Sequence, residues 1–267
     1  MNLDGRVVIV TGASGDIGSA TVRAFAAARA HVVLAAPLSE IHVLDQLASE
    51  AERCGARALI VPTDVTVRGD IDKLVSSTLD AFEAIDVLAN VAGIGSSPAV
   101  CDDTDDDLRR VVEVNLLGCA RMLHAVLPVM KMQRRGSIVN VGSIAGEAGV
   151  MGMYSATKFG LRGLSDTVRR EVRSWNIGVT LIEPGFVRSR MNVAMGDRLP
   201  SPDIVARAVV RAVSRPRRCV IVPGYYAVPI FITKLFPGLV DRVFGDARIQ
   251  RRLNRDARAA RAERVSP

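Results

Sequence analysis

Seven short apolar runs recur along the chain, separated by longer stretches in which apolar residues return at helical spacing. The runs carry β-branched and other apolar residues at successive positions, and this is typical of strands that are covered on both faces. The pattern therefore predicts a doubly wound parallel sheet of about seven strands, with helices on both faces in three α/β/α layers. The expected strands are residues 7–11, 31–36, 58–62, 86–90, 137–143, 178–184 and 219–223.

Helix signals lie between these runs. The segment after Gly18 is rich in alanine, and Thr104 stands before a stretch whose first turn carries several carboxylates. Thr104 is a good N-cap, and acidic side chains stabilise the first turn of a helix. The acidic run from Asp102 to Asp107 is also a conceivable metal site, but the electrostatics of a helix start explains it better.

The chain divides into one α/β domain, residues 1–225, and a C-terminal extension, residues 226–267. Within the domain we expect a substrate lid at about 192–214, with a capped helix beginning at Ser201. In the extension, apolar pairs recur every four residues, and Pro237 either interrupts one helical stripe or begins a second helix. Three roles remain open for this amphipathic and basic extension: it covers the substrate mouth, packs on a second subunit, or makes peripheral contact with a membrane.

Composition excludes several classes of function. The net charge of +7 comes largely from arginines between Arg248 and Arg264, and only 4% of residues are aromatic, so we expect no nucleic-acid binding. The four cysteines are far apart and the three histidines do not cluster with them, so the sequence suggests neither disulfides nor a metal site. Without a signal peptide or a membrane-spanning run, we expect a soluble, cytoplasmic protein.

A glycine-rich loop, Thr11–Gly18, follows the first apolar run and leads into a helix, as a phosphate-binding loop does. Asp16 is unexpected in it, because a carboxylate facing a pyrophosphate would repel it. We expect Asp16 instead to cap the helix or to accept a ribose hydroxyl, while Gly15 supplies the permissive backbone.

Tyr154 and Lys158 are four residues apart at the start of a predicted helix, so their side chains project from one face. A neighbouring cation favours the phenolate and lowers the pKa of a tyrosine from its usual value near ~10. Ser143, at the end of the fifth run, is placed to hold a substrate oxygen while Tyr154 exchanges a proton. The spacing suggests acid/base chemistry coupled to hydride transfer from a nicotinamide.

These motifs, in this order along residues 3–191, resemble those of the short-chain dehydrogenase/reductase family. The glycine loop, Asp64 in "TDVT", "NVAG" from Asn90, and Ser143 with "YSATK" carry the likeness, together with Asn115 in "VNLLG" and "PGFVRS" from Pro184. The resemblance implies a Rossmann-like fold and a dimer or tetramer. It also implies a catalytic tetrad of Asn115, Ser143, Tyr154 and Lys158.

By the same resemblance, Lys158 also binds the nicotinamide ribose and Asn115 supports a proton-relay water. Asp64 and Val65 flank the adenine, Asn90 stabilises the sheet beside the cofactor, and Val187 and Ser189 meet the carboxamide. The full set of cofactor-binding residues predicted is Gly12, Ser14, Gly15, Asp16, Ile17, Gly18, Ala36, Asp64, Val65, Asn90, Ala92, Gly93, Tyr154, Lys158, Pro184, Gly185, Val187 and Ser189.

The chain departs from the family pattern at three places. In the glycine loop, Asp16 replaces the middle one of the family's three glycines, and Gly15 supplies a glycine one residue earlier. The acid that favours NAD is replaced by Ala36, and the bases that favour NADP are absent at Gly15 and Pro37, so either cofactor remains open. The loop between Ser143 and Tyr154 is about two residues shorter than expected, and its glycines and methionines suggest an adaptable apolar wall.

The sequence therefore predicts an NAD(P)-dependent oxidoreductase that interconverts a secondary alcohol and a ketone on a small hydrophobic substrate. The alternative is a dinucleotide-binding sensor or scaffold protein with little or no turnover. The substrate and the preferred direction of the reaction remain undetermined.

Overall fold

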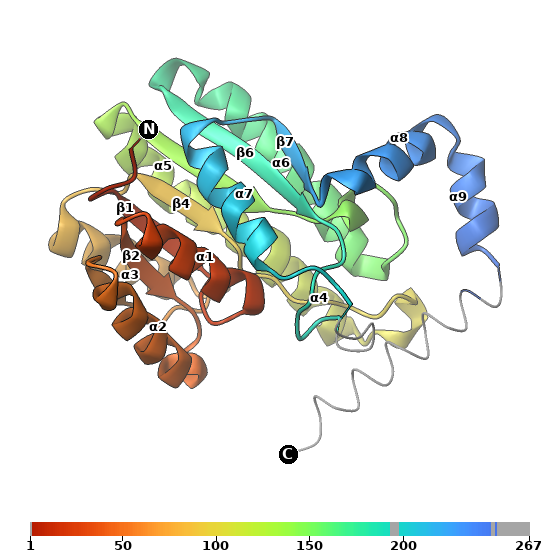
Figure 1. Ribbon diagram of the computed structural model, residues 1–267. Coiled ribbons are helices and arrows are strands. Elements are labelled where there is room, and N and C mark those ends of the chain that lie inside the picture. The colour runs from red at the N-terminus through yellow and green to blue at the C-terminus, as the bar shows by residue number, and fades with distance from the viewer. Residues whose placement is uncertain (1, 193–197, 247–248, 250–267) are drawn as a thin grey trace.

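The computed structural model describes residues 2–192, 198–246 and 249. A seven-stranded sheet in the order β3-β2-β1-β4-β5-β6-β7 forms the centre, and every neighbouring pair is parallel (Figure 1). This confirms the predicted doubly wound sheet. The strands are β1 (Val7–Thr11), β2 (His31–Ala35), β3 (Ala58–Ile60), β4 (Val87–Asn90), β5 (Gly136–Val141), β6 (Ile177–Pro184) and β7 (Cys219–Val222).

Helices cover both faces of the sheet, which explains why the strands lack alternation. In β1, Val8 and Val10 pack in one apolar cluster, while Val7 and Ile9 pack in the other. Each buried side chain of this kind contributes roughly 1.5–3 kcal/mol. The first face is covered by α1 (Asp16–Ala27), α2 (Ile41–Arg53) and α7 (Asp203–Ser214), and the second by α3 (Arg68–Phe82), α5 (Cys119–Gln133) and α6 (Gly152–Glu171).

The helix α4 (Asp105–Val112) begins as the sequence predicts. Thr104 accepts the Asp107 backbone N–H at 3.1 Å, and the Asp107 carboxylate accepts the Thr104 N–H at 3.0 Å, which completes a capping box. The acidic run thus serves the helix start. A π-helical segment, η3 (Glu113–Gly118), joins α4 to α5.

The helical run from Asp105 to Gln133 contains 29 residues and is long and apolar enough, by composition alone, to cross a bilayer. The sequence reading found no such run. In the fold, however, Met122, Val126 and Met130 of α5 are completely buried against the sheet. The run is therefore a core helix of the α/β domain.

The C-terminal extension begins with η7 (Gly224–Tyr226) and continues as α8 (Ala227–Leu235) and α9 (Pro237–Phe244). Pro237 occupies the first turn of α9, where its missing N–H costs nothing, so it starts a new helix rather than interrupting one. Both helices stand away from the sheet at the right of Figure 1.

The predicted lid at 192–214 is too long. Residues 193–197 lie outside the described part of the chain. Val205, Val209 and Val213 of α7 are buried in the core cluster that α1 shares. Ser201 does support the start of α7, since its hydroxyl accepts the Asp203 N–H at 3.3 Å. This helix therefore belongs to the body of the domain.

The remaining connections contain short 3₁₀ turns. They are η1 (Leu38–Glu40), η2 (Val100–Asp102), η4 (Ile144–Gly146) and η5 (Arg173–Trp175). Of these, η1 and η4 reach the cavity described below.

Candidate active site

A cavity of about 1630 Å³ opens at the carboxyl ends of the parallel strands. Its walls come from the segments that follow β1, β4, β5 and β6, and from the C-terminal extension. A pocket for a single drug-sized ligand measures roughly 300–1000 Å³. This cavity therefore has room for more than one ligand of that size.

The glycine loop is shaped by two close approaches of backbone. Gly12 has φ +64°, and a Cβ there would lie 2.7 Å from the Ala92 Cα. A Cβ at Gly18 would lie 1.9 Å from the Gly12 carbonyl oxygen. Only glycine fits at both positions. The tight loop that these glycines form places the N-terminal turn of α1 against the cavity, where its free N–H groups and the helix dipole favour an anion.

Asp16 is the first residue of α1, but its side chain does not cap the helix: Gly15 is the N-cap, with no side-chain hydrogen bond. The predicted cap is therefore wrong. The Asp16 carboxylate instead accepts the Arg190 backbone N–H at 2.8 Å, and the Arg190 guanidinium donates to the Ser14 carbonyl at 3.1 Å. The carboxylate thus ties the glycine loop to the segment after β6, with a cation 3.9 Å away.

Ser143, Tyr154 and Lys158 all line this cavity. The Ser143 hydroxyl accepts the Ala145 N–H at 3.1 Å, and this holds the turn after β5. Tyr154 and Lys158 lie in the first two turns of α6, with the Lys158 Nζ 5.4 Å from the centroid of the Tyr154 ring. The Lys158 ammonium donates to the Val141 carbonyl at 3.0 Å, so its position is fixed from β5.

Burial sets the proton affinities of these groups. Desolvation lowers the pKa of Lys158 from 10.5 to about 8, because only 4% of the residue is exposed. Desolvation also raises the pKa of Tyr154, and a hydrogen bond with Ser143 opposes this rise. The expected lowering of the tyrosine pKa by Lys158 is thus absent from the unliganded protein. At neutral pH the phenol keeps its proton and is available as an acid.

Asn115 and Asn90 do not line the cavity, unlike the other predicted site residues. Asn115 lies in η3, where its side chain accepts the Ile94 N–H at 2.8 Å and donates to the Ile94 carbonyl at 2.9 Å. A Cβ at Gly93 would be 3.3 Å from the Asn115 oxygen and 3.5 Å from the Lys158 Nζ, so both groups lie immediately behind this glycine. Asn90 donates to Asn140 at 2.9 Å and joins β4 to β5.

The remaining residues predicted to bind the cofactor face the cavity. At one end, Asp64 accepts the Thr66 N–H at 2.8 Å, which orders the turn after β3. The cavity-lining members of the predicted set are Gly12, Ser14, Gly15, Asp16, Ile17, Gly18, Ala36, Asp64, Val65, Ala92, Gly93, Tyr154, Lys158, Pro184, Gly185, Val187 and Ser189.

The sequence reading left the C-terminal extension with three roles, and the structure places part of it at the cavity. Tyr226, Pro229, Ile230 and Thr233 lie on its wall at helical spacing. A Cβ at Gly185 would lie 2.2 Å from the Tyr226 ring, so this ring packs directly on the loop after β6. The loop between Ser143 and Tyr154 also reaches the cavity, as predicted.

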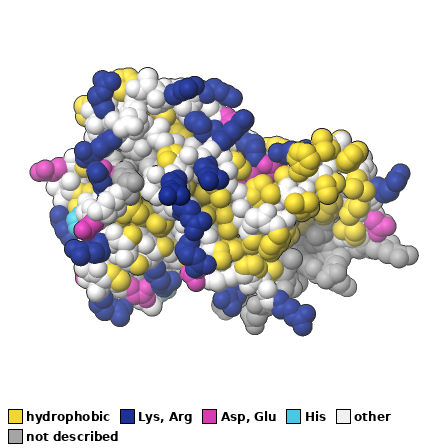
Figure 2. Space-filling model, turned by 45° about the horizontal axis from the view of Figure 1, so that its top comes forward, with side chains coloured by type: hydrophobic (Ala, Val, Ile, Leu, Met, Phe, Trp, Pro, Cys, Tyr) yellow, Lys and Arg dark blue, Asp and Glu magenta, His cyan; other side chains and the backbone are white. Residues whose placement is uncertain are grey.

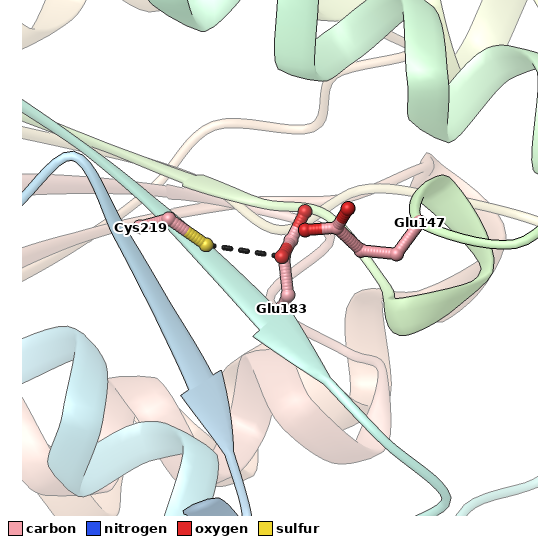
Figure 3. Close-up of side chains that lie close together, drawn as sticks. All are labelled: Glu147, Glu183 and Cys219. Atoms are coloured by element: carbon pink, nitrogen blue, oxygen red, sulfur yellow. Dashed lines mark hydrogen bonds between the residues drawn. The ribbon is translucent and has the colours of Figure 1, made fainter. Parts of the chain in front are cut away.

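A buried polar cluster behind the site was missed in the sequence. Glu147 from the loop after β5, Glu183 of β6 and Cys219 of β7 lie within 4.8 Å of one another by their ligand atoms (Figure 3). The Cys219 thiol donates to Glu183 at 3.0 Å, and burial raises the pKa of both groups. Arg162 contacts both carboxylates, and Lys234 of α8 lies 2.5 Å from Glu147. The cations balance the cluster, which makes it an ion-pair network rather than a metal site.

The sequence model of the short chain dehydrogenase family matches residues 6–199. The chain belongs to this family. The match covers the first six strands, the glycine loop and the tyrosine–lysine pair, and it identifies the protein as an oxidoreductase that uses NAD(P). The C-terminal extension lies beyond the match.

Relatives with assigned names include reductases. The chain is 36% identical over 200 residues to the 3-oxoacyl-(acyl-carrier-protein) reductase FabG of Thermotoga maritima, covering 74% of this chain and 80% of the relative. It is 30% identical over 259 residues to the ketoacyl reductase HetN of Nostoc sp., covering 91% and 89%. A solved short chain dehydrogenase/reductase from Burkholderia phymatum, in complex with NAD, superposes with a TM-score of 0.82 at 23% identity, covering 90% and 96%.

Proposed function

We propose that this oxidoreductase interconverts an apolar ketone and the corresponding secondary alcohol. One observation carries the proposal: a buried phenol, a serine hydroxyl and a buried ammonium face the same cavity as a glycine loop at a helix N-terminus. The family and its named reductases support a carbonyl–alcohol reaction, and the proposal adds the apolar substrate and the role of each residue.

The cavity fits a dinucleotide. Gly12 and Gly18 leave space that any Cβ would fill, and the first turn of α1 is suited to a pyrophosphate. In the proposal Asp64 and Val65 flank the adenine, Lys158 holds the nicotinamide ribose, and Val187 and Ser189 face the carboxamide. When bound, the nicotinamide supplies or accepts the hydride.

The protein residues handle the proton and the orientation. Ser143 donates a hydrogen bond to the carbonyl oxygen, and Tyr154 donates its proton to that oxygen during reduction. Burial raises the pKa of Tyr154, so the phenol carries the proton that the reduction needs. Lys158 holds positive charge beside the ring and thus stabilises the phenolate that remains. Asn115 holds the Ile94 backbone and, with it, the rear wall at Gly93.

An apolar substrate is supported by the walls at the Tyr154 end of the cavity. Val150 and Met151 from the short loop, Met191 after β6 and Ile230 of α8 all line the cavity. A sugar would leave its hydroxyl groups facing these side chains without hydrogen-bond partners, whereas a ketone on an aliphatic or ring skeleton would bury apolar surface against them.

We also propose that the protein is cytoplasmic and forms a homo-oligomer through the helices that bear Asn115 and Tyr154. Leu117 of η3 is 38% exposed and Phe159 of α6 is 44% exposed, so apolar side chains are available on this side of the domain. A second copy would cover them.

The test combines binding with turnover. A ligand that binds only the folded state raises the unfolding temperature, so we expect NADH or NADPH to stabilise the protein. With the stabilising cofactor, a panel of apolar ketones should be reduced and matched sugars should not. Stabilisation without turnover of any ketone would favour the alternative, a dinucleotide sensor or scaffold.

The contact between Asp16 and Arg190 gives a separate prediction. Arg190→Ala should weaken NADH or NADPH affinity about fivefold, because the Asp16 charge then faces the pyrophosphate without its cation. In an Asp16→Gly background, Arg190→Ala should weaken cofactor affinity by less than about twofold. Fluorescence titration of the four proteins measures both effects. An equal loss in the two backgrounds would mean that Arg190 does not act through Asp16.

A further inference from the structure

The C-terminal extension gathers most of the exposed apolar surface of the described chain. Eight of the fourteen large apolar side chains that are exposed there lie within residues 225–243. Figure 2 shows apolar side chains gathered over this part of the molecule. We call this surface the apolar ridge; it consists of Tyr225, Val228, Phe231, Ile232, Leu235, Phe236, Leu239 and Val243.

On α8 the ridge carries a single charged residue, whereas Asp241 and Arg242 are exposed on α9. Lys234 is the only charged residue between Tyr225 and Val240. Its ammonium lies 2.5 Å from a carboxylate oxygen of Glu147, whose side chain is only 3% exposed. The ion pair neutralises this cation, whose side chain is 48% exposed, and fixes α8 to the loop that follows Ser143. Phe231 and Leu235, beside it on α8, remain 63% and 57% exposed.

The sequence that follows the ridge is strongly basic. Between Arg248 and Arg264 there are seven arginines and two acidic residues, Asp256 and Glu263. Apolar helices followed directly by clustered arginines have the composition of a segment that binds anionic lipid, because each basic residue near such a surface is attracted to it.

The geometry points to a membrane-surface contact: the apolar ridge inserts shallowly into a bilayer that carries anionic headgroups, and the arginines after Arg248 bind those headgroups. The helices α8 and α9 have nine and eight residues, far below the roughly 20 needed to span a bilayer, so they lie in its interface.

Charge favours the bilayer over a second copy of this chain. A two-fold contact through the ridge would use the same patch on both copies, so both basic segments would flank one interface. The basic segment of each copy follows directly, at Arg248, and like charges repel. An anionic surface attracts the same residues.

The contact also places the cavity at the membrane, a point that rests on the proposed function. The inner face of α8 lines the cavity with Pro229, Ile230 and Thr233, while its outer face forms the ridge. A ketone dissolved in the bilayer would thus meet the enzyme at the side that carries Tyr154, without crossing water.

Flotation of the full-length protein with vesicles tests the contact without any substrate. We expect binding to vesicles of phosphatidylcholine with phosphatidylglycerol, and at least about tenfold weaker binding to phosphatidylcholine alone. The double variant Phe231→Glu with Leu235→Glu should lose about 30-fold or more of its binding to the anionic vesicles. The matched control, Val67→Glu with Val100→Glu, changes two exposed apolar residues outside the ridge and should bind as the wild type does.

Two outcomes would overturn the proposal. One is equal vesicle binding by the ridge variant and the wild type. The other is that the wild-type protein does not bind anionic vesicles, while the variant Phe231→Glu with Leu235→Glu has a smaller oligomeric state in sedimentation. That result would assign the ridge to a contact with a second copy. Binding of the cofactor by each variant shows that the variant is folded. If the protein reduces no ketone, the proposed function is wrong, but the membrane contact measured with vesicles is unaffected.

Discussion

Replacing Tyr154 by Phe should reduce turnover at least about 1000-fold while NADH or NADPH binding changes less than about threefold. Only the hydroxyl is removed, and the ring keeps its buried place in α6. The carbonyl oxygen then has no proton donor, although Ser143 still holds it. Steady-state rates with a reducible ketone and fluorescence titration of the cofactor measure the two quantities.

Ser143→Ala is the matched control for Tyr154→Phe. It removes the other hydroxyl on the same wall but leaves the proton donor, so its loss in turnover should be smaller, about 100-fold. Turnover by the Tyr154 variant at near the wild-type rate would assign the proton transfer to another group. A loss of cofactor binding equal to the loss of turnover would make Tyr154 a structural residue.

Lys158→Met should abolish most activity yet stabilise the unliganded protein at pH 7. The side chain is buried and the pKa of its ammonium falls from 10.5 to about 8, a difference worth about 3 kcal/mol. Loss of the hydrogen bond to the Val141 carbonyl destabilises the folded protein by about 1 kcal/mol. We therefore expect the free energy of unfolding to rise by about 2 kcal/mol in total. Turnover should fall by at least about 100-fold.

The pH dependence separates this effect from simple repacking. The folded pKa is depressed, so between pH 8 and pH 10.5 the unfolded chain holds more protons than the folded one. Stability of the wild type therefore rises with pH across this window. The advantage of Lys158→Met should be full below pH 8 and shrink toward pH 10.5 in chemical denaturation. A gain that is constant with pH would show that the ammonium is not the cause.

The sheet was predictable because its signal is local. Strands buried on both faces need apolar residues at every position, and all seven runs became strands, with ends that differ by at most two residues. β3, for example, ends at Ile60, although the apolar run continues to Pro62. The capping box at Thr104 was predictable for the same reason, since its partners are three residues apart.

The site was predictable only where its residues follow the ends of strands. Ser143 and the loop from Pro184 come directly after buried runs, and the spacing of Tyr154 and Lys158 puts them on one helical face. The partner of Asp16 is 174 residues away, and Glu147 meets Cys219 only across the packed strands. Such contacts depend on tertiary packing, which leaves no periodic signal.

The proton affinities were the least predictable feature. Sequence spacing places a cation beside Tyr154, and from that alone a lowered tyrosine pKa follows. In the fold, desolvation by burial is the larger effect and raises the pKa of Tyr154, and the hydrogen bond with Ser143 opposes this rise only in part. The prediction that Asp16 caps the N-terminus of α1 was wrong for a related reason. The segment after β6 offers the carboxylate a better-placed donor, the Arg190 N–H.

The central claim is direct hydride transfer between a nicotinamide and a carbonyl carbon held beside Tyr154. The most direct measurement uses NADH or NADPH deuterated at the reactive ring carbon, an apolar ketone from the panel, and mass spectrometry of the alcohol. The account predicts one deuterium on the carbinol carbon of the product in ordinary water, and none when unlabelled cofactor reacts in deuterated water followed by exchange of the hydroxyl. An alcohol whose carbinol hydrogen comes from solvent would contradict it.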